Sequence, residues 1–256
     1  MKKGKDMPKP IVFISHIVAE KELAIAFKEL IEENFLNMIE VFVSSDEHSI
    51  GMGQRWLDNI TEALKECSIE IILCSPKSIE RPWINFEAGA GWIRDIPVIP
   101  LCHSGMEPSK LPLPLNLLQG ANANQVSGLK LIFPVIAQAI GASIPNIDFS
   151  DFISKVSEFE KKYTYWNVVN ECFEKLYNFH PEIIQALKQG KTIQIELTET
   201  DIGKIESFIA PLTEREILSF QRLGGVKMTP GGTFYPCSLV PLKNLKATLE
   251  DKNFKL

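Results

Sequence analysis

Residues 75–87 read SPKSIERPWINFE and follow directly on residues 69–74, a strongly apolar run that reads IEIILC. A short apolar run of this kind, bounded by polar residues, is typical of a strand that is buried in a parallel sheet. The loop after it leads into a helix, on which Trp83 and Glu87 lie one turn apart and on the same side. The stretch therefore predicts a buried strand, a loop at its carboxyl end, and a helix that carries a tryptophan and a glutamate to one place.

The sequence on either side repeats this alternation of strand and helix. Apolar runs typical of strands occupy residues 11–15, 39–43 and 96–101. Helical spacing of apolar residues occupies residues 20–34, the segment with Trp56, Ile60, Leu64 and Cys67, and residues 129–140. Trp56 and Phe86 are expected in the core. The alternation predicts a flavodoxin-like α/β fold, a parallel sheet with helices on both faces, whose ligands bind outside the carboxyl ends of the strands.

The chain after residue 142 has a different pattern and predicts a second, smaller domain. Residues 141–146 have the composition of a linker, which places the first domain at residues 9–142 and the second at residues 150–256. In the second we expect helices over residues 152–161 and 167–176, a strand over 192–197, a helix that starts at 211–217 and a β-hairpin over 226–240. The second domain is therefore expected to be helical or of the α+β class.

The composition is that of an ordinary globular protein. The chain has 256 residues, a formal net charge of −5 and 5 cysteines, none of them in a CxxC pair. The negative charge argues against a protein that coats nucleic acid, and the scattered cysteines indicate a reducing compartment and no metal site. No apolar run approaches the ~20 residues that a membrane span needs, and the N-terminus lacks the pattern of a secretory signal. We therefore expect a cytoplasmic protein.

Three segments carry a resemblance to a known family. They read IVFISH over residues 11–16, VFVSSDEHSIGMGQRW over residues 41–56, and SPKSIERPWINFE over residues 75–87. In this order they resemble a bacterial-type Toll/interleukin-1 receptor (TIR) domain, in which FISH or FISY ends the first strand, D-x-x-x-I-x-x-G-x-x-W follows the second, and W-x-x-x-E opens the third helix. The resemblance covers residues 9–142. It departs from the family at residues 17–20, which read IVAE where a polar Ser-x-x-Asp stretch is usual.

The resemblance implies that the protein cleaves NAD⁺ and that Glu87 is the catalytic residue. A single glutamate suits this chemistry: nicotinamide leaves as a neutral molecule, so no general acid is required, and one carboxylate can hold the ribose hydroxyls and stabilise the developing oxocarbenium charge. Trp83 would stack on the nicotinamide ring or form part of the wall of the pocket. Further substrate-binding candidates are Ser15, His16, Ser45 and Asp46. NAD⁺ is then the substrate, and neither a cofactor nor a metal ion is expected.

The resemblance also implies self-association. TIR domains that resemble this one pack head to tail, so that the second loop of one copy borders the glutamate pocket of the next. Here that assembly loop contains Ile50, Gly51, Met52 and Gly53. Heterologous contacts of this kind generate open arrays instead of closed dimers. We therefore expect activity to depend on assembly through the TIR domains.

The leading interpretation is an NAD⁺ glycohydrolase that serves as the effector of a bacterial anti-phage or abortive-infection immune system. It would release nicotinamide and either ADP-ribose or a cyclised ADP-ribose, and the sequence leaves both products open. The alternative is a non-catalytic TIR–TIR scaffold or signalling adaptor, in which Glu87 only complements the helix dipole. A third interpretation, an enzyme that resembles a nucleoside deoxyribosyltransferase, requires a second active-site acid that we do not find.

The C-terminal domain is expected to sense a trigger or to bind a partner protein. Helices followed by a glycine-bearing hairpin are also compatible with a winged-helix-like unit, in which Lys227 and Lys243 would contact nucleic acid. Because the basic signal is weak, a small α+β sensing or docking domain with solvated lysines is the favoured interpretation.

Overall fold

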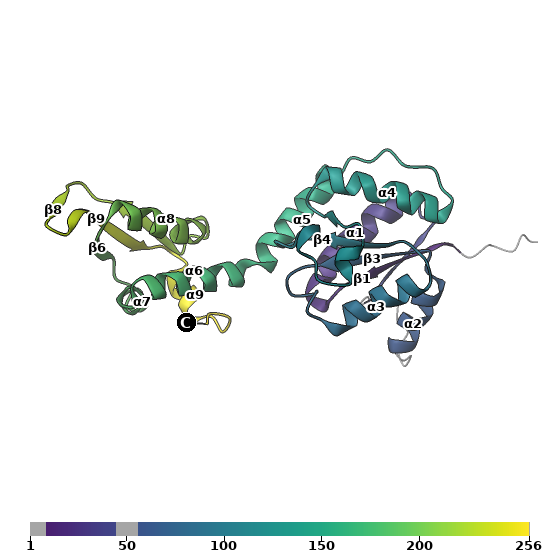
Figure 1. Ribbon diagram of the computed structural model, residues 1–256, viewed down its shortest axis with the longest axis horizontal. Helices are drawn as coiled ribbons and strands as arrows, with labels where there is room; N and C mark the ends of the chain where they lie inside the picture. Colours follow the sequence, from purple (N-terminus) through teal and green to yellow (C-terminus); the bar gives the residue numbers. More distant parts are fainter. Residues whose placement is uncertain (1–8, 45–55, 256) are drawn as a thin grey trace, which may run out of the picture. The chain divides into compact units, whose positions relative to one another are not determined.

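The structure is a computed structural model that describes residues 9–44 and 56–255. The chain divides into two compact units, Met1–Tyr163 and Thr164–Leu256. The first is built around a parallel sheet and the second around an antiparallel sheet (Figure 1). The structure therefore confirms the expected combination of an α/β fold and a smaller α+β region.

Among the residues described, five parallel strands form the sheet of the first unit, in the order β2-β1-β3-β4-β5. The strands are β1 (Ile11–Ser15), β2 (Glu40–Val43), β3 (Ile69–Cys74), β4 (Val98–Cys102) and β5 (Ala121–Asn122). The inner strands β1 and β3 are neighbours, and Ser15 pairs with Ile72. Because all strands run the same way, the loops that follow β1 and β3 emerge at the same edge of the sheet.

Helices cover both faces of this sheet (Figure 1). They are α1 (Lys21–Asn34), α2 (Trp56–Glu66), α3 (Pro82–Ile93), α4 (Val126–Ile140) and α5 (Ser150–Tyr163), with short 3-10 turns η1 (Val18–Glu20), η3 (Pro108–Lys110) and η4 (Leu115–Leu117). On one face α1, α4 and α5 share a core that contains Phe27 and Phe133. On the other face α2 and α3 pack, where Ile60 and Ile84 are buried. The helix with the candidate glutamate, α3, thus lies on the face opposite α5.

The helix α5 packs with the first unit. Its side chains Phe152, Val156 and Phe159 are buried in the same core as α1 and α4, and the ring of Phe152 lies 5.3 Å from that of Phe27. The division made from the sequence instead places residues 150–163 with the second domain. Amphipathic spacing predicts that a helix buries one face, but it does not say against which unit that face is buried.

The second unit surrounds a small antiparallel sheet in the order β6-β9-β7, with β8 paired to β9. Its elements are α6 (Tyr165–Phe179), α7 (Pro181–Lys188), β6 (Ile193–Leu197), α8 (Glu199–Glu214), β7 (Leu218–Arg222), β8 (Lys227–Thr229), β9 (Gly232–Pro241) and α9 (Leu245–Glu250). Phe173 and Ile205 are fully buried in its own core. β8 and β9 form the hairpin that the sequence predicts over residues 226–240.

The start of one helix in this unit was predicted wrongly. The sequence predicts a helix start at residues 211–217, whereas α8 already begins after Thr198 and ends at Glu214, with Pro211 inside it. The hydroxyl of Thr198 caps the helix by accepting a hydrogen bond from the backbone N–H of Asp201. Leu212, which follows the proline, is fully buried. Tertiary packing therefore carries the helix past a residue that by itself favours a helix start.

Candidate active site

The candidate catalytic glutamate lies at the carboxyl edge of the parallel sheet. Its helix α3 packs on β3, and its side chain is 0% exposed. Ser15 Oγ, at the end of β1, donates a hydrogen bond to Glu87 Oε2. Trp83 Nε1 donates a second one to Glu87 Oε1 across 2.7 Å. Both carboxylate oxygens are therefore held by donors, one from the sheet and one from the same helix.

The surroundings of Glu87 change its protonation. Burial raises the pKa of the Glu87 carboxyl to about 7, and the hydrogen bonds from Ser15 and Trp83 oppose part of that shift. Both protonation states are then populated near neutral pH. A buried carboxyl of this kind can act as an acid, as a base or as a fixed negative charge beside a developing cation.

A pocket with a volume of about 700 Å³ lies beside Trp83, the hydrogen-bond partner of Glu87. Its lining residues are His16, Ile17, Val18, Ala19, Ser44, Arg81, Trp83 and Ile84. The lining is mostly apolar, and Arg81, the N-cap of α3, supplies a cation. Trp83 both lines the pocket and bonds to Glu87, so its indole links the pocket to the buried carboxylate. The volume lies in the range of small-molecule sites.

The structure brings the candidates of the first and third loops together. His16 and Trp83 line the pocket, while Ser15 contacts Glu87. His16 is itself buried, and its Nδ1 lies 3.1 Å from the hydroxyl oxygen of Ser44. The second-loop candidates lie outside the described residues; they are Ser45, Asp46, Ile50, Gly51, Met52 and Gly53. Their roles stay predictions.

Phe86 lies at the surface, so its expected place in the core is wrong. Its side chain is 59% exposed, and its ring stacks on that of Trp83 with the centroids 5.0 Å apart. Residues three positions apart are neighbours on a helix surface, so Phe86 packs beside the indole and not against the sheet. The side chain of Trp56, the other expected core residue, lies outside what the structure describes.

A second buried carboxyl, which the sequence patterns did not single out, lies between β3 and α3. Glu70 is 0% exposed, and neither of its oxygens has a hydrogen bond of good geometry to any residue that the structure describes. Burial, and then the nearby charge of Glu87, raise the pKa of Glu70 to about 9. Glu70 is therefore protonated at neutral pH. The signal that could have found it is a lone glutamate in an otherwise apolar strand, IEIILC.

Gly91 allows α3 to approach the sheet at this carboxyl. A Cβ atom at this position would overlap Oε2 of Glu70 and lie 2.7 Å from Cγ2 of Val98. Side chains essentially never pack so closely, so only glycine fits without a shift of the helix or of the Glu70 and Val98 side chains. Gly91 lies one turn after Glu87, so a shift of the helix at Gly91 would also move Glu87.

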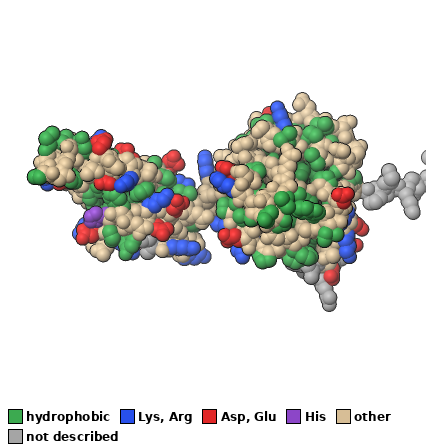
Figure 2. Space-filling model, viewed as in Figure 1, with side chains coloured by type: hydrophobic (Ala, Val, Ile, Leu, Met, Phe, Trp, Pro, Cys, Tyr) green, Lys and Arg blue, Asp and Glu red, His purple; other side chains and the backbone are tan. Residues whose placement is uncertain are grey.

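The two lysines considered for nucleic-acid contact are both paired. Nζ of Lys227 lies 2.8 Å from a carboxylate oxygen of Glu196, and Nζ of Lys243 lies 2.5 Å from one of Glu216. On the face of the second unit that Figure 2 shows, Lys and Arg side chains are interspersed with Asp and Glu. This distribution gives little support to a nucleic-acid surface.

Within residues 9–44 and 56–255, no group of His, Cys, Asp and Glu side chains could hold a metal ion. No helix in the same part of the chain has the length and apolar character to cross a membrane. The cysteines are free and buried, as small core residues are.

Comparison with known proteins identifies the class of the first unit. The sequence model of the TIR domain family TIR_2 matches residues 12–132, the part that holds the parallel sheet and Glu87. Residues 12–132 are therefore a TIR domain.

Two solved structures illustrate the similarity. The chain is similar to the TIR domain of the Toll-related receptor TRR-2 from Hydra magnipapillata, with 18% identity and a TM-score of 0.40, over 51% of this chain and 97% of that chain. It is also similar to the TIR domains of the activated Roq1 resistosome, which directly recognises the pathogen effector XopQ. There the identity is 16% and the TM-score 0.33, over 61% of this chain and 84% of that chain. No curated protein sequence matches the chain.

Proposed function

We propose that this TIR domain cleaves NAD⁺ at the bond between nicotinamide and ribose, with Glu87 as the catalytic carboxylate. The observation that carries the proposal is the setting of Glu87, a buried carboxyl bonded to Ser15 and Trp83 beside a pocket with an apolar lining. Membership of a family that includes NAD⁺-cleaving enzymes supports the same function.

The reaction mainly requires a negative charge at a fixed position beside the ribose. The glycosidic bond breaks with its electron pair going to the nicotinamide nitrogen, which becomes neutral, and a ribosyl cation remains. Ionised Glu87 stabilises that cation and accepts hydrogen bonds from the ribose hydroxyls. Water then adds to the cation and loses a proton, which yields ADP-ribose, or an adenine nitrogen adds and yields a cyclic product. Both outcomes use the same carboxylate.

Substrate binding requires Glu87 to change partners. Because the hydroxyl of Ser15 and the indole N–H of Trp83 occupy its two oxygens, a ribose hydroxyl must replace one of these donors. An indole that releases Glu87 stays in the pocket lining and can stack on the nicotinamide ring. We assign Arg81 to the pyrophosphate, because its guanidinium lies in the lining of the same pocket.

The biological role that we propose is that of an effector in a bacterial immune system against phage, which acts by consuming NAD⁺. Association of TIR domains would switch the activity on, with the assembly loop of one copy beside the Glu87 pocket of the next. The complete burial of Glu87 in a single chain supports such control, because an isolated copy keeps its carboxylate covered. The second unit would sense the trigger or bind the partner that starts assembly.

The same burial favours one alternative, a TIR domain that scaffolds without catalysis. In that case Glu87 would only fasten α3 to the end of β1 through Ser15. Burial raises the pKa of Glu87 in either case. Only the catalytic role requires turnover of NAD⁺, so turnover separates the two functions.

The deciding experiment incubates the purified full-length protein with NAD⁺ and measures nicotinamide by chromatography across a wide range of protein concentrations. Glu87→Gln keeps the size of the side chain and is expected to lower the rate by roughly 100-fold or more. Glu80→Gln is the matched control, because Glu80 is an exposed glutamate in the same stretch, and it should retain the parental rate. A Glu87→Gln protein as active as the parent would disprove the catalytic role, and an assembled parent without turnover would favour the scaffold.

A further inference from the structure

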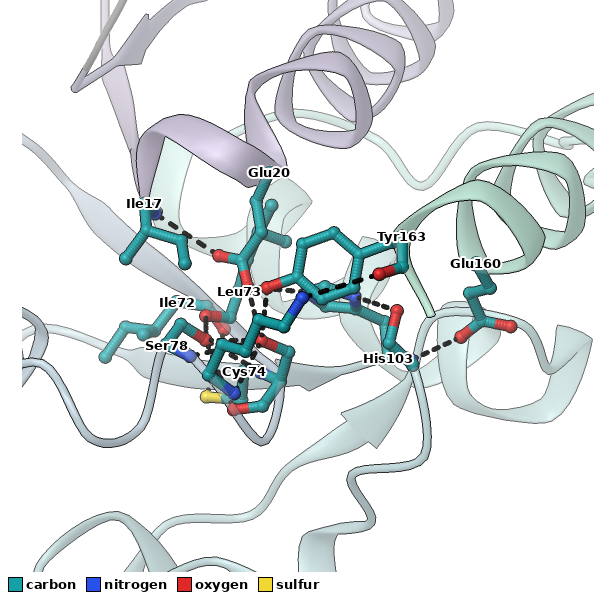
Figure 3. Close-up of polar contacts among 12 residues, drawn as sticks. Ile17, Glu20, Ile72, Leu73, Cys74, Ser78, His103, Glu160 and Tyr163 are labelled. Carbon is teal, nitrogen blue, oxygen red and sulfur yellow. Dashed lines mark hydrogen bonds and ion pairs between the residues drawn. The ribbon is translucent and has the colours of Figure 1, made fainter. Parts of the chain in front are cut away.

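Side chains from four separate segments of the first unit form a buried polar cluster around one carboxylate (Figure 3). Oε1 of Glu20 accepts hydrogen bonds from Ser75 Oγ at 2.6 Å and from the hydroxyl of Tyr163 at 3.1 Å. Nε2 of His103 lies 3.2 Å from the same oxygen. Glu20, Ser75 and His103 are almost completely buried. We call these four residues the Glu20 cluster.

The cluster keeps a charge inside the protein. Although burial acts to raise the pKa of the Glu20 carboxyl, the contacts with His103, with the Ser75 hydroxyl and with a backbone N–H outweigh it and hold the pKa below its usual value. A buried carboxylate remains ionised only while such partners are present. These contacts hold the Glu20 carboxylate in place, and the hydroxyl of Tyr163 is a further donor to the same oxygen.

Two walls of the candidate pocket are attached to this carboxylate. On the first wall, the backbone N–H of Ile17 donates to Oε2 of Glu20 across 3.2 Å, and Ile17 lines the pocket. The second wall begins at Ser75, whose backbone N–H donates to the hydroxyl of Ser78 across 2.7 Å. That loop ends at Arg81, which also lines the pocket. One carboxylate thus connects the loop after β1 with the loop after β3.

Tyr163 comes from outside the segment that matches the TIR family. The match ends at residue 132, whereas Tyr163 is the last residue of α5. Besides its bond to Glu20, its hydroxyl lies 2.9 Å from Ser75 Oγ, and Nζ of Lys77 lies 4.5 Å from the centre of its ring. One turn earlier in α5, Glu160 accepts a hydrogen bond from the backbone N–H of Ser104 at 2.6 Å. The end of α5 is therefore fastened to loops at the carboxyl edge of the sheet.

We propose that Tyr163 is a positioning residue of the candidate site. Its hydroxyl, through Glu20 and Ser75, sets the positions of residues 17–20 and 75–81, the loops that contribute to two walls of the pocket. The consequence for turnover rests on the proposed NAD⁺ cleavage, but the effect on the loops does not. Because Thr164, the first residue of the second unit, follows directly, the positioning residue stands at the junction of the two units.

The test compares Tyr163→Phe with the parent in the full-length protein. This variant keeps the ring and removes only the hydroxyl, so the fold should persist. Amide hydrogen exchange is expected to become faster in both loops, residues 17–20 and 75–81, on the order of tenfold for the loss of a hydrogen bond to a charged group. Exchange in the core strand β3 should not change. The matched control is Tyr177→Phe, which removes the hydroxyl of an exposed tyrosine and should leave both loops as in the parent.

A second variant guards against a general loss of stability. Lys77→Met removes the cation from the Tyr163 ring but leaves the hydroxyl, so it should speed exchange in residues 75–81 and not in residues 17–20. Unchanged exchange in both loops of Tyr163→Phe, or equal acceleration throughout the first unit, would overturn the proposal. Exchange is measured without substrate, so a protein that passes this test but shows no NAD⁺ cleavage in its assembled form would disprove the proposed function alone. Where turnover is present, Tyr163→Phe should raise KM for NAD⁺ more than it lowers kcat.

Discussion

Trp83 donates its indole N–H to Glu87 across 2.7 Å, and the same indole lines the pocket. One side chain therefore forms part of the wall that a ligand would touch and also favours the ionised form of the buried carboxyl. This pairing links the occupancy of the pocket to the charge of Glu87, and it makes the role of the tryptophan measurable through pH.

Trp83→Phe keeps an aromatic wall but removes the donor to Glu87. Because that hydrogen bond holds the pKa of Glu87 down, its loss should raise this pKa above about 7. The ionised form is the active one in our proposal, so the acidic limb of the kcat/KM profile should move to higher pH and activity at pH 7 should fall. Trp92→Phe, a partly exposed tryptophan on the same helix, is the control. An unshifted profile for Trp83→Phe would show that the bond does not tune Glu87.

Glu70→Gln should stabilise the protein at neutral pH. The folded-state pKa of Glu70 is about 9, against 4.5 for the free group. Below pH 4.5 the Glu70 carboxyl is neutral in both the folded and the unfolded protein. Above that pH the unfolded chain releases a proton that the folded protein keeps. The free energy of unfolding of the parent therefore falls as the pH rises toward 9. A glutamine side chain does not titrate, so the Glu70→Gln variant does not lose stability in this way. The gain at pH 7 should be on the order of 1–3 kcal/mol.

Unfolding in denaturant at several pH values between 4 and 9 measures this difference. Glu66→Gln provides the comparison, because Glu66 is an exposed glutamate at the end of the neighbouring helix α2. Equal pH dependence in the parent and in Glu70→Gln would mean that the Glu70 carboxyl is ionised in the folded protein, with a partner that this structure does not contain.

Gly91→Ala and Gly89→Ala should have opposite effects, although both lie on α3. A Cβ at Gly91 would overlap Glu70 Oε2 and Val98 Cγ2, so the helix or these side chains must shift, at a cost of roughly 1–3 kcal/mol in unfolding free energy. A Cβ at Gly89 meets no atom within 4 Å, so alanine there should stabilise the helix by about 0.5–1 kcal/mol. A shift of α3 would also move Glu87, so the Gly91→Ala variant should lose NAD⁺ cleavage as well. Thermal unfolding measures the changes in stability, and nicotinamide release measures the change in NAD⁺ cleavage. A Gly91→Ala variant as stable as the parent would refute the close approach of α3 to the sheet.

The fragment of residues 1–163 should fold independently, whereas the fragment of residues 1–142 should not fold well. The shorter fragment corresponds to the domain expected from the sequence, but it lacks α5 and leaves the apolar surface under Phe152, Val156 and Phe159 open to water. Each buried side chain of this size contributes about 1.5–3 kcal/mol. Cooperative thermal unfolding of the longer fragment, and binding of a hydrophobic dye by the shorter one, are the expected results. A shorter fragment as stable as the longer one would show that α5 is dispensable.

Activity is expected to depend on assembly through the loop at residues 46–53. Met52→Asp or Gly53→Pro should abolish turnover by blocking contact between TIR domains, although both residues are remote from Glu87 in the sequence. Turnover per molecule should rise steeply with protein concentration, and light scattering on the same samples reports the assembly. Turnover that stays constant on dilution, together with fully active loop variants, would show that the monomer suffices.

The fold of the first unit follows from patterns that are local in the sequence. Apolar runs such as IEIILC predict buried strands because each strand of a parallel sheet is covered on both faces. Trp83 and Glu87 share a side because their spacing matches one helical turn. Strand ends gather at one edge of a parallel sheet, so the nearness of Ser15 to Glu87 could also be anticipated.

Only the tertiary structure decided how those elements are completed. Periodicity predicts that α5 has an apolar face, but only the contact with Phe27 shows which unit receives it. The exposure of Phe86 and the continuation of α8 through Pro211 depend on neighbours that are distant in the sequence. The Glu20 cluster joins four segments, from Glu20 to Tyr163. A buried charge is tolerated only where several chain segments converge on it, and no local pattern contains that convergence.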